Sequence, residues 1–214
     1  MNDHQRQTAD VDSLIKSFMA HACAGEIEAL RDLVAGGFDL NGRNQFGDTI
    51  LEYTISTLDL YPQAPKYAVI REMLRLGTDP DGPSQDGSRP VFAAALNMDT
   101  EMLRLLLDAG ADPNVVHLRI DGDGESLYDW AHAVYLDEVW QGHSFTEVKP
   151  ADREDEDNWL RHLSRLAHHY DKARPDHLQL LRERGALSMF ELHSDTRNRP
   201  PRQAARNSQA RKSL

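Results

Sequence analysis

Few side chains in this chain of 214 residues have the types and the spacing that chemistry requires. The segment Asp121-Gly-Asp-Gly-Glu125 offers carboxylates as a calcium loop does, but such a loop needs a Glu at its twelfth position, where His132 stands. His162, His168 and His169 are six and seven residues apart, whereas two ligands on one face of a helix are three or four residues apart. Neither group therefore predicts a metal site.

Catalytic motifs are also missing from the sequence. It holds no phosphate-binding glycine loop, no Gly-x-Ser-x-Gly elbow and no zinc-type pair of cysteines. Cys23 is the one cysteine, so it cannot form an internal disulfide, and we expect it to be a buried structural residue. We therefore expect no enzymatic activity, no cofactor and no bound metal, unless segment 141–174 hides a catalytic site.

Charge is distributed unevenly along the chain. The 24 Lys and Arg against 35 Asp and Glu give a net charge of -11, yet residues 197–214 hold six basic residues and no acidic one. The most acidic stretch is 119–157. A strongly acidic body attracts basic partners and repels nucleic acid. No window is apolar enough to span a membrane and the N-terminus is polar, which predicts a cytoplasmic protein.

Apolar side chains recur with helical spacing in four segments that each end at a glycine, namely 27–37, 67–77, 100–110 and 175–185. Seven residues before the glycine stand Leu30, Ile70, Leu103 and Leu178, and four residues before it stand Leu33, Met73, Leu106 and Leu181. Such spacings place side chains on one face of a helix, which the glycine can end by adopting a left-handed conformation. Arg182 interrupts the apolar pattern of the last segment, which predicts a terminal repeat that faces water.

A polar turn and a further helix pattern connect these segments. Thr49 and Ser126 are predicted helix caps, and Pro90 suits the first turn of a helix. The best-defined unit begins with Arg89-Pro90-Val91-Phe92-Ala93-Ala94-Ala95 and ends with Leu-Leu-Asp-Ala-Gly-Ala-Asp-Pro-Asn114. These two stretches resemble the T-P-L-H-x-A-A and L-L-x-x-G-A-D-x-N motifs of ankyrin repeats.

This resemblance implies an all-α solenoid of helix-turn-helix repeats with an extended concave side. The histidine position of the family motif is occupied here by Glu52, Phe92 and Asp129, so its usual turn hydrogen bonds are in question. We expect a flexible N-terminus at 1–12, a repeat domain at 13–188 and a disordered basic tail at 189–214. The repeats are placed at 13–47, 48–87, 88–124 and 125–188.

The last repeat contains an insertion at 141–174. Within it, Trp159, Leu160, Leu163, Leu166 and Ala167 form an apolar stripe at helical spacing. We therefore expect an extra helix over 155–169 that packs on the C-terminal end, with a degenerate fifth repeat as the alternative. Trp140 and Trp159 are expected to pack together, and the histidines of this helix are expected to face solvent.

In ankyrin repeats the turn tips and first helices usually contact another protein, so the resemblance implies a candidate partner-binding set. Its members here are Arg43, Asn44, Gln45, Phe46, Tyr53, Gln85, Asp86, Phe92, Asp121, Asp123 and Tyr128. Phe46 is the sharpest candidate because an aromatic side chain at a polar tip is a natural interface anchor. For Tyr53, Phe92 and Tyr128, on the first helices, the sequence leaves open whether the side chain faces the core or the groove.

The function that follows is a non-catalytic interaction module for a basic protein, with a stoichiometric inhibitor of the immunity or antitoxin type as one version. The alternative is an adaptor whose basic C-terminal tail contacts a second partner or nucleic acid. The sequence leaves the oligomeric state open.

Overall fold

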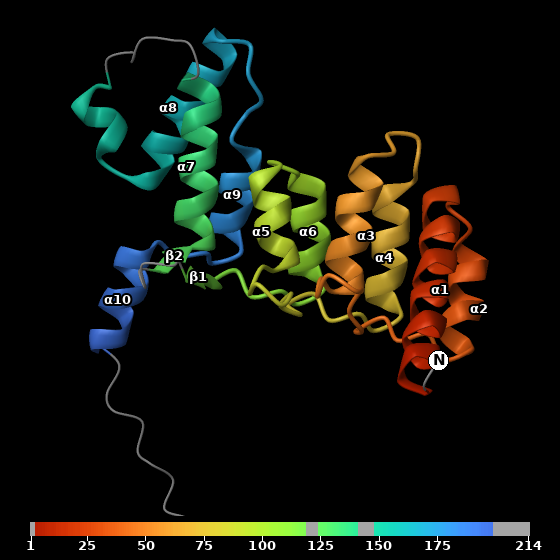
Figure 1. Ribbon diagram of the computed structural model, residues 1–214. Helices are drawn as coiled ribbons and strands as arrows, with labels where there is room; N and C mark the ends of the chain where they lie inside the picture. The colour runs from red at the N-terminus through yellow and green to blue at the C-terminus, as the bar shows by residue number, and fades with distance from the viewer. Residues whose placement is uncertain (1–2, 119–123, 141–147, 199–214) are drawn as a thin grey trace, which may run out of the picture.

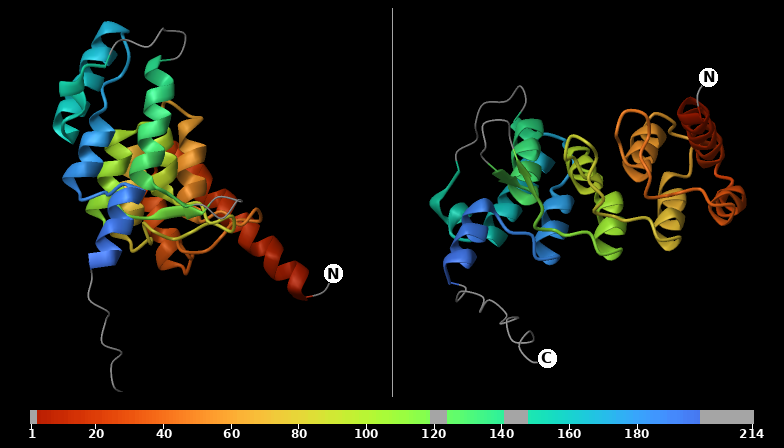
Figure 2. Two further views of the ribbon diagram at one scale, coloured as in Figure 1. Left: turned by 90° about the vertical axis from the view of Figure 1, so that its left-hand side faces the viewer. Right: turned by 60° about the horizontal axis from the view of Figure 1, so that its bottom comes forward.

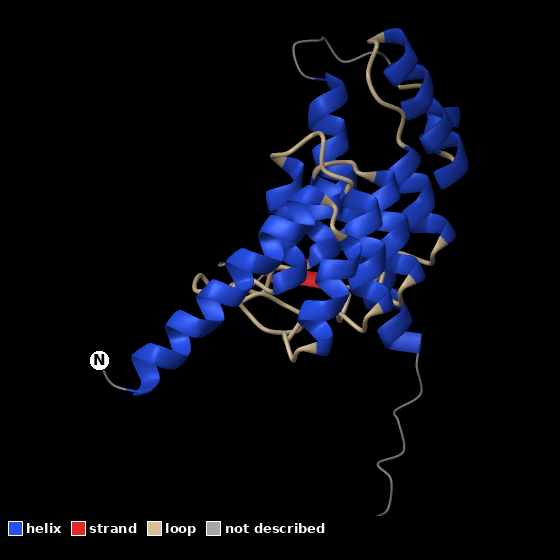
Figure 3. Ribbon diagram, turned by 90° about the vertical axis from the view of Figure 1, so that its right-hand side faces the viewer, coloured by secondary structure: helices blue, strands red, loops and turns tan. Residues whose placement is uncertain are grey.

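The computed structural model describes residues 3–118, 124–140 and 148–198, and helices dominate it (Figure 3). Four helix pairs follow one another along the chain. They are α1 (Asp3–Ala24) with α2 (Ile27–Ala35), α3 (Ile50–Asp59) with α4 (Lys66–Arg75), α5 (Pro90–Leu96) with α6 (Thr100–Asp108), and α7 (Leu127–Trp140) with α9 (Asp176–Glu183). The predicted all-α repeat fold is confirmed.

The pairs stack into two layers (Figure 1; Figure 2, right). First helices contact first helices along the series α1, α3, α5 and α7, and second helices contact one another along α4, α6 and α9. The turns between the pairs lie along one edge, below the helices in Figure 1. A short antiparallel pair, β1 (Val116–Leu118) and β2 (Gly124–Ser126), extends this edge before α7.

Local signals explain where the helices begin and end. The Thr49 side chain accepts a hydrogen bond from the Glu52 N–H, and Ser126 Oγ accepts one from the Asp129 N–H, so both act as the predicted caps. Gly77 follows the end of α4 with φ of 99°, a left-handed conformation that favours glycine.

The core runs without interruption through the layers. All four apolar residues predicted seven positions before a glycine are buried, namely Leu30, Ile70, Leu103 and Leu178. Burying a side chain of this size stabilises a fold by ~1.5–3 kcal/mol. Because every repeat contributes to the same cluster, stability depends on contacts between neighbouring repeats.

The insertion contains η1 (Pro150–Arg153) and α8 (Glu156–His169), so the expected extra helix is present. Figure 1 shows α8 beside α7 at the C-terminal end of the stack. Trp159 Nε1 donates to His132 Nε2 on α7 over 2.6 Å, and Leu163 and Leu166 are buried. The expectation of solvated histidines holds for His168 and His169 but is wrong for His162, which is buried on the same face.

The expectation that Arg182 faces water is also wrong. Its guanidinium lies 3.8 Å from the centre of the Tyr128 ring and forms salt bridges with Glu156 of α8 and Glu191 of α10 (Met189–Asn198). The inserted helix and the C-terminal helix therefore cover the end of the last repeat.

Both ends of the described chain are more helical than expected. Helix α1 begins at Asp3, inside the segment predicted to be flexible, and neither Gly nor Pro interrupts the sequence before Gly25. Residues 189–198 form α10 in place of irregular tail, because Ser188 and Glu191 make a reciprocal capping box: the Ser188 N–H donates to Glu191 and Ser188 Oγ accepts from the Glu191 N–H. The rest of the predicted tail lies outside the described residues.

None of the described helices is both long and apolar enough to cross a bilayer.

Candidate interaction surface

The first turn tip is built around the side chain of Asn44. Its Oδ1 accepts hydrogen bonds from the N–H groups of Phe46 and Asp48, at 2.9 and 3.0 Å, while its Nδ2 donates to the Asp48 carboxylate. Asn44 is buried by these contacts, so it shapes the tip and offers little surface to a partner. The same turn projects Phe46, whose side chain is 71% exposed.

The first two tips are joined to each other. The Gln85 N–H donates to the Gly47 carbonyl over 2.9 Å, and Arg43 Nη1 donates to the same oxygen over 2.8 Å. Gly47 has φ of 86°, and a Cβ there would lie 2.3 Å from the Gln85 side chain. Arg43, Gln45, Gln85 and Asp86 are exposed around this joint, which holds the backbone of the two tips together.

Carboxylates replace the family's histidine in linking the turns. Glu52 accepts hydrogen bonds from the hydroxyl groups of Ser84 and Ser88 in the next turn. Asp129 accepts one from Ser126 Oγ and one from the Met189 N–H. The departures from the motif at these two positions therefore keep the turn-to-helix bonding.

The aromatic candidates of the first helices divide into buried and half-buried residues. Phe92 and Tyr128 are 7% and 4% exposed, so they belong to the core and leave the candidate contact set. Tyr53 is half-buried. Asp121 and Asp123 lie outside the described residues.

Two surface residues were missed by the sequence analysis. His117 of β1 and Trp130 of α7 are half-buried, and their rings meet edge to face with centroids 5.0 Å apart. Both rings also meet the Phe92 ring edge to face, with centroids 5.6 Å apart. The step from Phe92 to Trp130 spans neighbouring repeats, so a pattern within one repeat could not reveal it.

Comparison with protein families gives one match. Residues 86–118 match the family model of the ankyrin repeat. This segment is similar to an ankyrin repeat. It contains α5, α6 and β1, the part with the clearest motifs in the sequence. Among curated proteins, none matches the chain. Ankyrin repeats generally mediate protein–protein interactions and are typically not catalytic.

The turn edge of the repeat stack carries a row of acidic side chains. Asp39, Asp79 and Asp112 stand two residues after the helix-ending glycine in successive repeats, and all three are exposed. Each carboxylate accepts a hydrogen bond from the N–H two residues later, at 2.9, 2.9 and 2.8 Å. Among the described residues no cation forms a salt bridge with them. Their charges are therefore available to a partner.

Charge also differs between the two layers of helices. The first helices α3, α5 and α7 contain no Lys or Arg, and their acidic residues are Glu52, Asp59, Asp129, Asp137 and Glu138. In the second layer, arginines neutralise carboxylates internally: Arg31 and Arg75 both bind Glu72, at 2.7 and 2.5 Å. Hydrogen bonds from Arg75 and Arg31 lower the pKa of Glu72 to about 2. In the first layer, Asp59 pairs with Lys66 at 2.7 Å and Glu138 with Lys172 at 2.8 Å, so this layer is also partly neutralised. In the described part of the chain no salt bridge neutralises the acidic row of the turn edge.

The residues considered for chemistry form no reactive constellation in the described part of the chain. Cys23 is half-buried against the core. His162 Nδ1 lies 3.3 Å from the Asp152 carboxylate, and burial lowers the His162 pKa. No group of three potential metal ligands occurs among residues 3–118, 124–140 and 148–198.

Proposed function

We propose that this chain is a non-catalytic interaction module that binds a basic protein on its turn edge and first helices. The supporting observation is the row formed by Asp39, Asp79 and Asp112, which repeats with the fold and is not neutralised internally. A partner with arginines at matching intervals gains one charge-assisted hydrogen bond at each repeat.

Recognition in this proposal has two parts. The acidic row steers a basic partner into the complex, because complementary charge accelerates association. Phe46 then buries its exposed ring against the partner and supplies an anchor of the aromatic kind that dominates interfaces. Arg43, Gln45, Gln85 and Asp86 surround that anchor as polar contacts.

One specific version of this function is a stoichiometric inhibitor, such as an immunity or antitoxin-like protein that covers a basic enzyme. The chain's size and net charge of -11 are consistent with that version. It requires a one-to-one complex in which the partner's activity is lost, and a complex with full partner activity contradicts it.

The decisive experiment compares two isoelectric variants of the full chain. The test variant is Asp39→Asn/Asp79→Asn/Asp112→Asn, in which the amide oxygen can still accept the turn hydrogen bonds. The control is Asp32→Asn/Glu101→Gln/Asp108→Asn, which removes the same charge from the second-helix layer.

Proteins captured from native cell extract at ~50 mM and ~300 mM salt identify the partner, since the higher salt shortens the screening length to about 6 Å. The purified pair then gives Kd. We expect the test variant to bind about tenfold more weakly, because exposed ion pairs contribute ~0.2–1 kcal/mol each. Equal losses in test and control variants would contradict the proposed face.

A further inference from the structure

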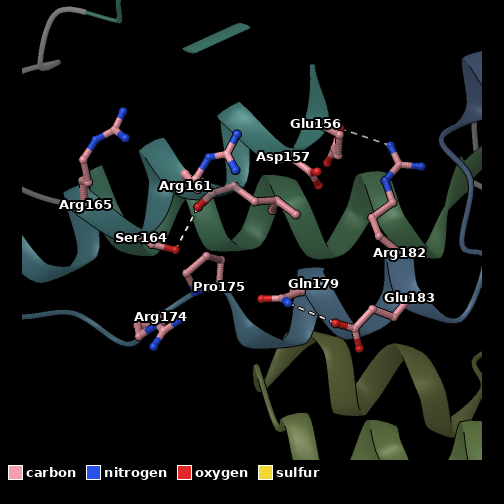
Figure 4. A pocket seen from close by; sticks show the side chains of 11 residues that line it. Glu156, Asp157, Arg161, Ser164, Arg165, Arg174, Pro175, Gln179, Arg182 and Glu183 are labelled. Carbon is pink, nitrogen blue, oxygen red and sulfur yellow. Dashed lines mark hydrogen bonds and ion pairs between the residues drawn. The ribbon is translucent and has the colours of Figure 1, made fainter. Parts of the chain in front are cut away.

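A second candidate site lies outside the turn edge, in a cleft between α8 and α9. The cleft encloses about 670 Å³, within the range of ligand-binding clefts. Leu160 and Pro175 contribute apolar surface between two charged ends. We call it the α8–α9 cleft. Figure 4 shows Arg165 and Arg174 toward one end, Arg161 between that end and Asp157, and Glu156, Arg182 and Glu183 toward the other end.

The basic end combines arginines from two elements. Arg161 and Arg165 are four residues apart on α8, so they share a helix face, and Arg174 precedes α9. Arg165 pairs with Asp152 at 2.5 Å, and Arg174 with Asp176 at 3.5 Å. Arg161 bonds only a neutral acceptor, Asn158 Oδ1, and forms no salt bridge within the described residues.

These guanidinium groups keep donors for a ligand. Each carries five N–H donors, and the hydrogen bonds and salt bridges within the protein occupy few of them. The Arg165 and Arg174 side chains are more than half exposed, so a ligand can reach both. A guanidinium fork matches a carboxylate in geometry and charge.

The acidic end is largely engaged within the protein. Glu156 binds Arg182 and accepts a hydrogen bond from the Tyr128 hydroxyl, and Glu183 accepts one from Gln179 Nε2. Counted over the residues that line the cleft, four arginines, Arg182 included, face three carboxylates, Asp157 included. The lining therefore carries an excess of one positive charge in a chain whose net charge is -11. This local reversal points to an acidic ligand.

We propose that the α8–α9 cleft binds a short acidic segment of a protein, with Asp or Glu side chains on Arg161, Arg165 and Arg174 and an apolar residue over Leu160 and Pro175. A protein segment fits better than nucleic acid, because the acidic body repels a long polyanion whereas a short peptide brings few charges. The chain would then hold a basic protein on the turn edge and an acidic segment on the cleft. This inference does not rest on the turn-edge proposal.

The test uses the full chain and a defined probe, the fluorescein-labelled peptide acetyl-Glu-Asp-Leu-Glu-Asp-amide, followed by fluorescence anisotropy. The cleft variant is Arg161→Gln/Arg174→Gln, which leaves the Arg165–Asp152 pair intact. The control is Arg71→Gln/Arg104→Gln, an equal loss of charge on α4 and α6. Circular dichroism verifies that all three proteins are folded to the same extent.

We expect the cleft variant to bind the peptide about tenfold more weakly than the wild type, and the control variant less than about twofold, since a charged hydrogen bond contributes ~1.5–3 kcal/mol before solvent screening. Absence of peptide binding to the wild type overturns the proposal. Equal affinity of all three proteins also overturns it and assigns the peptide to the basic C-terminal residues. A labelled oligonucleotide that outcompetes the peptide at the cleft replaces the acidic segment with nucleic acid.

Discussion

Replacing Asp81 by Asn should stabilise the protein, because Asp81 stands in a position built for an amide. Asn41, Asp81 and Asn114 each lie four residues after a helix-ending glycine. Asn41 donates to the Gly77 carbonyl over 3.2 Å and accepts from the Asp79 N–H over 2.7 Å. The next repeat is thereby tied to the previous one by two hydrogen bonds.

The same pair of bonds recurs at the far end. Asn114 donates to the Gly185 carbonyl over 3.1 Å and accepts from the Leu187 N–H over 2.9 Å. Asp81 makes the accepting bond alone, from the Asp112 N–H over 2.8 Å. Its Oδ1 is buried and has no hydrogen-bond partner among the described residues, and a carboxylate cannot donate to the equivalent acceptor, the Gly110 carbonyl.

The expected gain follows from these two differences. Asp81→Asn adds one neutral hydrogen bond and removes an unsatisfied buried oxygen, which together contribute about 1–2 kcal/mol to the free energy of unfolding. For a domain of this size that corresponds to a rise in Tm of about 3–6 °C. Urea unfolding measures the change in the free energy of unfolding directly, provided that the variant and the wild type have the same m-value.

The pH dependence separates this explanation from others. Burial raises the pKa of Asp81 above its ordinary value, so the folded state holds this proton more tightly than the unfolded state does. The wild type therefore loses stability as pH rises from the ordinary Asp pKa through the raised pKa of Asp81, and the advantage of Asp81→Asn is fully developed above it. Below the ordinary value, protonated Asp81 can itself donate, and the advantage shrinks.

The reverse substitution is the matched control. Asn114→Asp should destabilise the protein by a similar amount at neutral pH, whereas Asp39→Asn, at an exposed carboxylate of the turn edge, should change the free energy of unfolding by less than about 0.5 kcal/mol. The explanation is wrong if Asp81→Asn leaves the free energy of unfolding unchanged or lowers it, or if the gain in this free energy does not vary with pH.

Three further predictions concern the core, a buried histidine and the exposed anchor. Leu106→Ala should destabilise by ~2–5 kcal/mol in urea unfolding, because Leu106 is fully buried. Burial lowers the pKa of His177 to about 4, so between this value and the ordinary His pKa the unfolded state binds more protons than the folded state. The free energy of unfolding should therefore fall by about 3 kcal/mol as pH drops from 6.5 to 4. His177→Phe should remove most of this dependence of stability on pH. Phe46→Ala should leave the free energy of unfolding within about 0.5 kcal/mol of the wild type while weakening partner binding in a titration.

Helical periodicity carried most of the fold prediction. Leu103 and Leu178 are buried because spacings of three and four record which face of a helix meets the core. The insertion helix obeyed the same rule, and His162 could have been included in its buried face, since it stands three residues after Trp159 and four before Leu166. The prediction for His162 was wrong because it relied on the polar residue type and not on the position in the helix.

The end of the domain was harder to predict because its contacts join distant segments. Arg182 lies against residues 26 positions before it and 9 positions after it, and nothing in its own helix specifies that pairing. Helix α10 did have a local sequence signal, the Ser188-x-x-Glu191 capping box. The prediction missed it because the basic composition of residues 197–214 indicated a disordered tail. Phe92 and Tyr128 moved from contact candidates to core because burial depends on the neighbouring repeat.

The α8–α9 cleft shows why charge counts along a chain do not locate a binding site. The order of charges is acidic at Glu156 and Asp157, basic at Arg161 and Arg165, basic at Arg174 and acidic at Glu183. Eight residues of α8 separate Asp157 from Arg165 by about 12 Å along the axis. Because α8 and α9 run in opposite directions in Figure 4, that order brings Arg165 to the same end as Arg174, and Glu156 to the same end as Glu183, where Arg182 also lies. A cleft with a basic end therefore forms from a segment in which acidic residues flank a basic middle, and its polarity depends on the antiparallel arrangement of the two helices.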